Sequence, residues 1–200
     1  MIAKNVSTAS GKKIVRLEDP PVARALFGEP RWAWIWLILR LYAGYEWIEA
    51  GYEKLNSPAW TGAQAGVGLA GFVKGALSKT TGANPDVQTW YALFLQHAVL
   101  PHAALWSYLV SYGETLVGVA LVLGIFTGIA AFFGSFMNMN YLLAGAVSTN
   151  PILLLIAAFL ILAWKTAGWW GVDRWLLPQL GTPWSPGPVL GERSTAGAAA

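Results

Sequence analysis

Five polar residues interrupt long apolar segments of this chain, and their types are suited to charge and proton chemistry: Arg40, Glu46, Glu114, Asn138 and Asn140. Apolar surroundings tolerate ionisable side chains only where these are paired or functional. A buried arginine supplies positive charge, and a buried carboxyl group can donate a proton. We therefore expect Arg40, Glu114 and Glu46 to be the catalytic residues of any reaction that this chain carries out.

The elements that hold these residues are predicted from a segment without charge. Between Thr115 and Trp164 the chain runs for fifty residues without a charged side chain. As helix, that length spans about 75 Å, which crosses a hydrocarbon core of about 30 Å twice. The whole chain has 56% hydrophobic and only 12% charged residues, and many of its twelve tryptophans lie near the ends of apolar segments. These features are typical of a small protein embedded in a lipid bilayer.

Composition also excludes several classes of function. The chain has no cysteine, so it cannot exchange disulfides or hold an iron–sulfur cluster by itself. Its net charge of +3 is not concentrated in a patch that would bind nucleic acid. The only histidines, His97 and His102, are five residues apart across Pro101, which is no recognised ligand pattern. We expect neither haem nor a metal ion.

The predicted fold is all-α, a polytopic membrane protein with four transmembrane helices in one bundle. Apolar periodicity, Pro151 and short Gly- or Asn-containing turns delimit these helices. The predicted spans are 32–52, 103–123, 127–147 and 151–168. The loop 53–102 is predicted to be external and to carry two helices, a glycine-rich one over 60–77 and an amphipathic one over 87–99 that Pro101 ends.

Both ends of the chain are predicted to lie outside the transmembrane domain 32–168. Residues 1–31 form a partly ordered tail on the membrane surface, and 169–200 form an irregular tail rich in Trp, Pro and Gly, with 194–200 disordered. The first tail carries six Lys or Arg residues, and 165–200 carry three, whereas the short turns carry none. The positive-inside rule then predicts a multi-pass protein of the cell membrane with both termini cytoplasmic.

Helical rise predicts that the polar groups meet near the middle of the membrane. Arg40 lies about 12 Å and Glu114 about 18 Å from the cytoplasmic side, so that the long arginine side chain reaches the carboxylate. One interpretation is a structural ion pair completed by Asn138 or Asn140. The other is a site for a quinone head group or a small anion, in which Arg40 supplies charge and Glu114 or Glu46 a proton.

On the second interpretation the expected cofactor is a quinone, because quinone reduction consumes protons that a buried carboxyl group can provide. We expect Asn138, Asn140, Trp47 and Tyr112 to bind it. Trp47 shares one face of the first span with four other residues at helical spacing, namely Arg40, Gly44, Gly51 and Lys54. The two glycines would let a neighbouring helix approach that face closely.

The same face, Arg40-x3-Gly44-x2-Trp47-x3-Gly51-x2-Lys54, resembles the opening motif of the DoxX family, and segment 114–127 resembles the family's second-span motif. Segments 136–144 and 148–151 resemble the DoxD-like branch, which includes the large membrane subunit of thiosulfate:quinone oxidoreductase. The similarity covers about residues 35–178. It implies a four-helix membrane bundle.

The resemblance also implies a function. The chain would be a membrane subunit of an oxidoreductase complex that couples oxidation of thiosulfate, or a related sulfur compound, to quinone reduction. A second small subunit or a soluble redox partner would accompany it. The alternative is a non-catalytic membrane anchor or scaffold for redox or sulfur-handling partner proteins. A small-molecule transporter is a third interpretation, although the chain shows neither repeated halves nor an interrupted helix.

Overall fold

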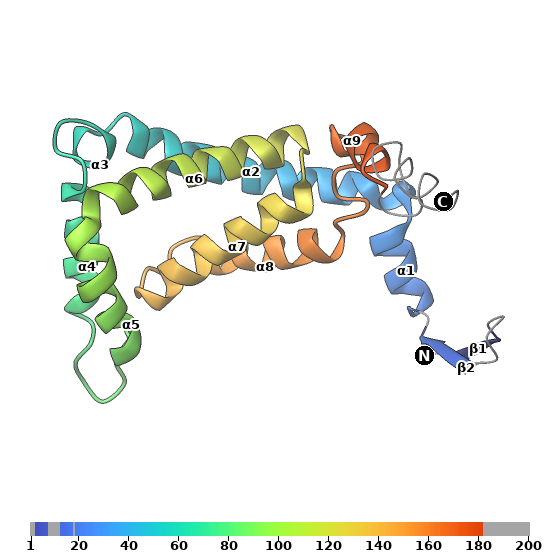
Figure 1. Ribbon diagram of the computed structural model, residues 1–200, viewed down its shortest axis with the longest axis horizontal. Coiled ribbons are helices and arrows are strands. Elements are labelled where there is room, and N and C mark those ends of the chain that lie inside the picture. The colour runs from blue at the N-terminus through green and yellow to red at the C-terminus, as the bar shows by residue number, and fades with distance from the viewer. Residues whose placement is uncertain (1–2, 8–12, 18, 182–200) are drawn as a thin grey trace, which may run out of the picture.

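The computed structural model describes residues 3–7, 13–17 and 19–181, and apart from one N-terminal hairpin their regular elements are all helical (Figure 1). The hairpin pairs β1 (Ala3–Ser7) with β2 (Lys13–Leu17) in antiparallel fashion. The long helices are α2 (Ala33–Leu55), α6 (Ala103–Leu123), α7 (Thr127–Leu143) and α8 (Asn150–Leu162). The shorter ones are α1 (Pro21–Gly28), η1 (Pro30–Trp32), α3 (Pro58–Thr61), α4 (Val67–Leu77), α5 (Thr89–Phe94), η2 (Leu95–Val99), η3 (Leu100–His102) and α9 (Asp173–Gln179). The prediction of a helical protein is confirmed.

The four long helices pack in two pairs around a shared apolar core. Helix α2 lies along α6, and α7 lies along α8, while α6 also contacts α7 and α2 contacts α8. The core between them is built from side chains such as Trp47, Val117, Ala131 and Leu160. Figure 1 shows α6 and α7 diverging from the turn that joins them, with α4 and α5 standing across the open end.

Glycines set how closely α2 and α6 pack, and in which register. A Cβ atom on Gly118 would lie 2.7 Å from the backbone nitrogen of Ile48, and one on Gly44 would lie 3.1 Å from the carbonyl oxygen of Gly118. Gly51 faces the backbone of Thr115 in the same way. The predicted close approach on this face of α2 is confirmed. The helices run antiparallel, so the C-terminal end of α2 lies beside the middle of α6.

Helices α4 and α5, together with η2, form an arm (residues 67–99) with a small core of its own. Leu69 and Val73 of α4 pack with Tyr91 of α5 and with Leu95 of η2 in this core. Helix α3 fastens the start of the arm to α6, because Ser107 donates a hydrogen bond to the carbonyl oxygen of Trp60 at 2.7 Å. The predicted helix over 60–77 is thus divided in two, α3 and α4.

Among the described residues, one helical run is long and apolar enough to cross a membrane, Thr89–Leu123. The run includes Pro101, which lies in η3, and the chain changes direction between α5 and α6 there, in agreement with the expectation that this proline ends the preceding helix (Figure 1). Helix α6 alone has 21 residues, about the length that a crossing needs.

The other three long helices do not meet the same criteria of length and composition. Helix α2 has 23 residues but carries several charges, and α7 and α8 have 17 and 13 residues, fewer than the roughly 20 of a full crossing. The four-crossing topology and the cytoplasmic placement of both termini therefore remain predictions.

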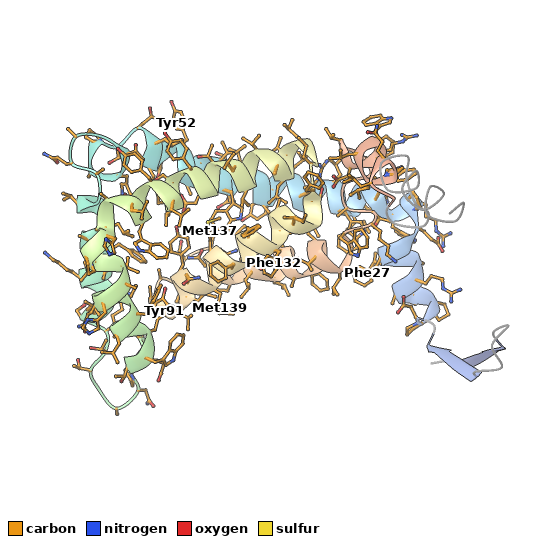
Figure 2. The ribbon with its side chains drawn as sticks, in the orientation of Figure 1. Phe27, Tyr52, Tyr91, Phe132, Met137 and Met139 are labelled. Atoms are coloured by element: carbon orange, nitrogen blue, oxygen red, sulfur yellow. The ribbon has the colours of Figure 1, made fainter. Side chains whose placement is uncertain are left out.

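The outer faces of the long helices are nevertheless apolar. Large hydrophobic side chains that are more than half exposed occur on each of them, including Ile38, Leu116, Phe132 and Leu155. Figure 2 shows side chains covering these faces, with Phe132 labelled on α7. Soluble monomers rarely expose apolar surface on this scale. The distribution indicates apolar surroundings for the helical body.

Described parts of both end segments form regular structure that packs on the helical body. Within the N-terminal segment 1–31, α1 docks on the body, because Trp36 Nε1 donates a hydrogen bond to the carbonyl oxygen of Leu26 at 2.9 Å and the Trp36 ring stacks on Phe27. The prediction of irregular chain after Trp170 was wrong for residues 173–179, which form α9. The predicted disorder of 194–200 lies outside the described residues.

Candidate functional site

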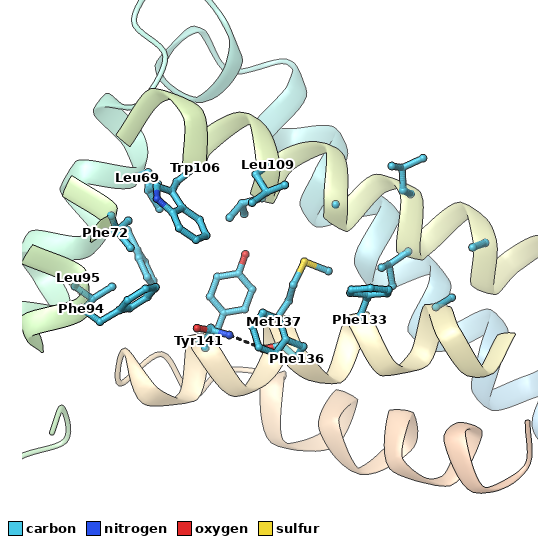
Figure 3. Close-up of a pocket in the computed structure, with 18 of the residues that line it drawn as sticks. Leu69, Phe72, Phe94, Leu95, Trp106, Leu109, Phe133, Phe136, Met137 and Tyr141 are labelled. Atoms are coloured by element: carbon cyan, nitrogen blue, oxygen red, sulfur yellow. Dashed lines mark hydrogen bonds between the residues drawn. The ribbon is translucent and has the colours of Figure 1, made fainter. Parts of the chain in front are cut away.

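A cavity of about 640 Å³ lies between the arm, α6 and α7 (Figure 3). Its walls are almost entirely apolar: the arm contributes Leu69, Phe72, Phe94 and Leu95, α6 contributes Trp106 and Leu109, and α7 contributes Phe133, Phe136 and Met137. The divergence of α6 and α7 creates this space, and the arm closes its wide end. A cavity of this size accommodates an organic molecule with a ring and part of a hydrocarbon tail.

The cavity opens through the outer faces of α6 and α7. Leu109 and Leu116 on α6, and Phe133 and Phe136 on α7, both line the cavity and are more than half exposed. These are the faces whose apolar character indicates apolar surroundings. A hydrophobic molecule could therefore enter from the side without crossing water.

Polar side chains enter the cavity only near its wide end. Tyr141 points its hydroxyl group into the space between α6 and the arm, as Figure 3 shows. Asn140 and Tyr91 also line the cavity, and the Tyr91 hydroxyl donates to the backbone oxygen and to Oδ1 of Asn140, at 3.0 and 3.1 Å. This contact ties the arm to α7. A few polar groups in an apolar cavity are the usual arrangement for orienting a ligand.

Tyr141 connects the cavity to a buried ion pair. Its hydroxyl donates a hydrogen bond to Oε1 of Glu114. The Glu114 carboxylate is 1% exposed and receives Lys54 Nζ at 3.0 Å on Oε1 and 2.8 Å on Oε2. Burying a carboxylate is costly unless a cation and further donors satisfy it, and here Lys54 and Tyr141 do so. We call Lys54, Glu114 and Tyr141 the polar chain.

The Lys54 end of the polar chain reaches the protein surface near the start of α3. Lys54 lies in the last turn of α2, and its side chain is 19% exposed. Its Nζ also donates to the carbonyl oxygen of Ala50 at 3.3 Å and lies 5.2 Å from the centre of the Trp60 ring. The three residues therefore link solvent near the start of α3 to the interior of the cavity.

The predicted ion pair between Arg40 and Glu114 was wrong. Because the glycine contacts place Gly51 beside Thr115, Lys54 rather than Arg40 lies level with Glu114. Arg40 instead lies level with Gly124, ten residues and about 15 Å of helical rise further along α6. The two groups belong to opposite ends of the α2–α6 pair.

Arg40 is buried in a structural joint at the other end of the molecule. It is 1% exposed, donates from Nη2 to the carbonyl oxygen of Trp170 at 3.0 Å, and is acted on by the negative charge of Asp173. The Asp173 carboxylate accepts the backbone N–H groups of Phe126 and Thr127, at 2.6 and 2.8 Å, and so caps α7. Arg40 and Asp173 thus fasten α9 to the turn between α6 and α7.

The structure distributes the remaining predicted residues differently. Of the predicted cofactor-binding residues, Asn140 lines the cavity, whereas Trp47 and Asn138 are buried outside its lining and Tyr112 is exposed. Trp47 packs against Gly134 of α7. Glu46 is half-buried on α2 and lies outside the cavity lining. His97 and His102 are both exposed.

Sequence reasoning missed three residues of this site: Lys54, Tyr141 and Tyr91. A signal existed for Lys54, which shares the glycine-containing face of α2. Tyr141 is three residues beyond Asn138 in a charge-free run, where a tyrosine is most simply interpreted as packing. Tyr91 belongs to the predicted external loop 53–102, and nothing in its local sequence indicates contact with α7.

Comparison with known proteins adds one finding. The protein-family model described as DoxX matches residues 35–146, more than half of the chain, from the first turn of α2 to just beyond α7. No curated protein and no solved structure matches the chain significantly. The matched region contains the cavity lining and the whole polar chain.

Proposed function

Because this chain belongs to the DoxX family and is therefore a membrane protein, we propose that it is the membrane subunit of an oxidoreductase complex and that it binds a quinone in the cavity between the arm, α6 and α7. The observation that carries this proposal is the polar chain. It connects the protein surface near Lys54 to an apolar cavity that is open at its side.

The cavity suits a quinone in three respects. Its apolar walls suit a substituted ring and an isoprenoid tail, and the lateral opening between α6 and α7 would let the tail extend into lipid. The Tyr141, Tyr91 and Asn140 side chains gather at the wide end, where an oxygen-bearing head group would be oriented. A water-soluble anion such as thiosulfate would find no cationic side chain in this lining.

A bound quinone would supply two-electron chemistry, and its reduction takes up two protons. The three residues of the polar chain, Lys54, Glu114 and Tyr141, provide a route for these protons. Lys54 contacts both carboxylate oxygens of Glu114, and Oε1 is shared with the Tyr141 hydroxyl. A proton that reaches Glu114 from the surface would make its carboxyl group a donor to the Tyr141 oxygen, and the Tyr141 hydroxyl could then turn its own hydrogen into the cavity and donate it to the quinone.

We further propose thiosulfate, or a related sulfur compound, as the source of electrons. Support comes from segments 136–144 and 148–151, which resemble the DoxD-like branch. The chain has no cysteine, so the proposal assigns the oxidation of the sulfur compound to a second subunit or a soluble partner. In the proposed complex both termini of this subunit are cytoplasmic, and the Lys54 side chain faces the external loop.

Filling the cavity should weaken quinone binding without disturbing the polar chain. Gly113 lines the cavity, and a Cβ atom there would meet only Met137 Sδ at 3.5 Å, an ordinary contact. We expect Gly113→Leu to weaken binding of a decyl-tailed quinone by at least about tenfold, because the added side chain competes for the same space. Quenching of tryptophan fluorescence in the purified protein measures binding. Thiosulfate-dependent quinone reduction in membranes that contain the complete complex measures activity.

The matched control is Gly113→Ala, which adds a methyl group at ordinary contact distance and should bind quinone nearly as the parent protein does. Equal binding by all three proteins would refute the assignment of the cavity. Stable soluble partners in a complex that neither binds nor reduces quinone would favour the anchor function instead.

A further inference from the structure

Most polar hydrogens of the side chains that line the cavity already form hydrogen bonds within the protein. This determines which oxidation state of the ligand the cavity binds better. Four side chains that line the cavity carry N–H or O–H donors: Tyr91, Trp106, Asn140 and Tyr141. A tyrosine hydroxyl has one hydrogen to donate but two lone pairs, and an indole has one hydrogen and no lone pair to offer. The partner of each hydrogen therefore decides what the group can still do for a ligand.

Tyr141 is committed to Glu114. The Tyr141 hydroxyl donates its one hydrogen to Oε1 of Glu114, whose Oε2 lies 2.8 Å from Lys54 Nζ. The Tyr141 oxygen, which points into the cavity, is left with lone pairs only. To a ligand, this residue is a hydrogen-bond acceptor.

The other donors are committed in the same way. The Tyr91 hydroxyl donates to Asn140, and Trp106 Nε1 donates to the carbonyl oxygen of Ala98 at 3.0 Å. Asn140 Nδ2 uses one of its two hydrogens on the carbonyl oxygen of Phe136 at 2.8 Å. Within the described residues, the cavity thus presents two phenolic oxygens as acceptors, against a single amide hydrogen that is not engaged.

We propose that the cavity binds the reduced, hydroxyl-bearing quinol more tightly than the oxidised quinone. The inference rests on the proposed function and specifies the form of its ligand. A quinol hydroxyl donates to the Tyr141 oxygen, whereas a quinone carbonyl placed there meets lone pairs and gains no hydrogen bond. Tighter binding of the reduced form also makes the bound quinone easier to reduce, since whatever binds more tightly is favoured at equilibrium.

The test compares a decyl-tailed quinol with the matching quinone, under anaerobic conditions, on the purified full-length protein in detergent. The dimethyl ether of the quinol is a redox-inert probe that has the same ring but no hydroxyl hydrogen. Quenching of tryptophan fluorescence gives each dissociation constant. We expect the quinol to bind about tenfold more tightly than the quinone and the ether, which corresponds to about 1.4 kcal/mol.

Two variants and one control show which residues cause the preference. Tyr141→Phe removes the acceptor and should reduce the preference to within about twofold, whereas Tyr45→Phe, an exposed position on α2, should leave it unchanged. Glu114→Gln should reverse it, because the glutamine amide can donate to the Tyr141 oxygen and release the tyrosine hydrogen for a quinone carbonyl. Thermal unfolding of each variant confirms that it is folded.

The outcomes separate this inference from the function on which it rests. Equal binding of quinol and quinone by the parent protein, or a preference that Tyr141→Phe does not change, would overturn the inference while leaving the cavity as a quinone site. If neither form binds, the proposed function fails and the inference fails with it.

Discussion

Glu114→Gln is expected to lower the rate of quinone reduction by at least about a hundredfold, the usual size of a general acid–base contribution. The glutamine amide cannot carry a proton between Lys54 and Tyr141, although it occupies the same volume and still contacts both. Because the cavity walls are unchanged, the decyl-tailed quinone should still bind. The loss should therefore appear in the turnover number, measured as thiosulfate-dependent quinone reduction by the intact complex.

The matched control is Glu49→Gln, which neutralises an exposed carboxylate on α2. Its turnover should equal that of the parent protein. A full rate in Glu114→Gln would show that protons reach the cavity by another route and would remove the polar chain from the mechanism. A loss of the same size in both variants would point to a general effect of charge.

Asp173→Ala is expected to destabilise the folded protein by about 3–5 kcal/mol. The carboxylate caps α7 through the N–H groups of Phe126 and Thr127, next to a turn in which Phe126 adopts a positive φ of 46°. Its charge also acts on Arg40, which is buried and would be left without that compensation. Thermal unfolding in detergent should show a large fall in the midpoint.

Two further variants separate the cap from the charge. Asp173→Asn keeps one acceptor oxygen and should fall between the parent protein and Asp173→Ala. Adding Arg40→Met to Asp173→Ala removes the uncompensated cation and should recover part of the lost stability. Asp86→Ala, at an exposed loop position, is the control. An unchanged midpoint in Asp173→Ala would contradict the structural role of the Arg40–Asp173 joint.

The sequence predicted the starts of the long helices well, because these are marked locally, whereas α7 and α8 end at Leu143 and Leu162, before the predicted ends at 147 and 168. Helix α6 occupies its predicted range 103–123, since Gly124 adopts the left-handed conformation (φ 67°) that ends it, and Pro151 begins the α8 helix near its predicted start. The buried face of α2 was also predictable from the spacing of its glycines. These features depend on residues that are close together in the chain.

The partners of the charged residues were not predictable in the same way. Helical rise places Arg40 and Glu114 at similar depth only if the helix ends are level, whereas the contacts of Gly44 and Gly51 with α6 shift the register and bring Lys54 to Glu114. Asp173 is a single carboxylate in a tryptophan-rich segment, and its partners are more than forty residues away. Such pairings follow from packing between elements rather than from any local pattern.

The arm was the element that sequence reasoning placed least well, and it makes the cavity. An amphipathic helix over 87–99 was expected to lie at the membrane interface. The structure adds contacts that this expectation did not include: the Tyr91 hydroxyl donates to Asn140, and Lys79 Nζ donates to the carbonyl oxygen of Gly145 at 2.6 Å, so that the arm closes against the end of α7. Of the apolar residues of this segment, Phe94, Leu95 and Val99 line the cavity beside α6 and α7, whereas Trp90 and Leu93 are exposed.

The central claim is that the cavity between the arm, α6 and α7 binds a quinone, and photolabelling tests it most directly. The purified protein is irradiated with a decyl-tailed azidoquinone, and the labelled peptides are identified by mass spectrometry. We predict labels at Trp106 and Met137, on the facing walls of α6 and α7, that excess unlabelled quinol removes and that Gly113→Leu suppresses. Labels spread over the exposed faces of α2 and α8, without competition by quinol, would contradict the account.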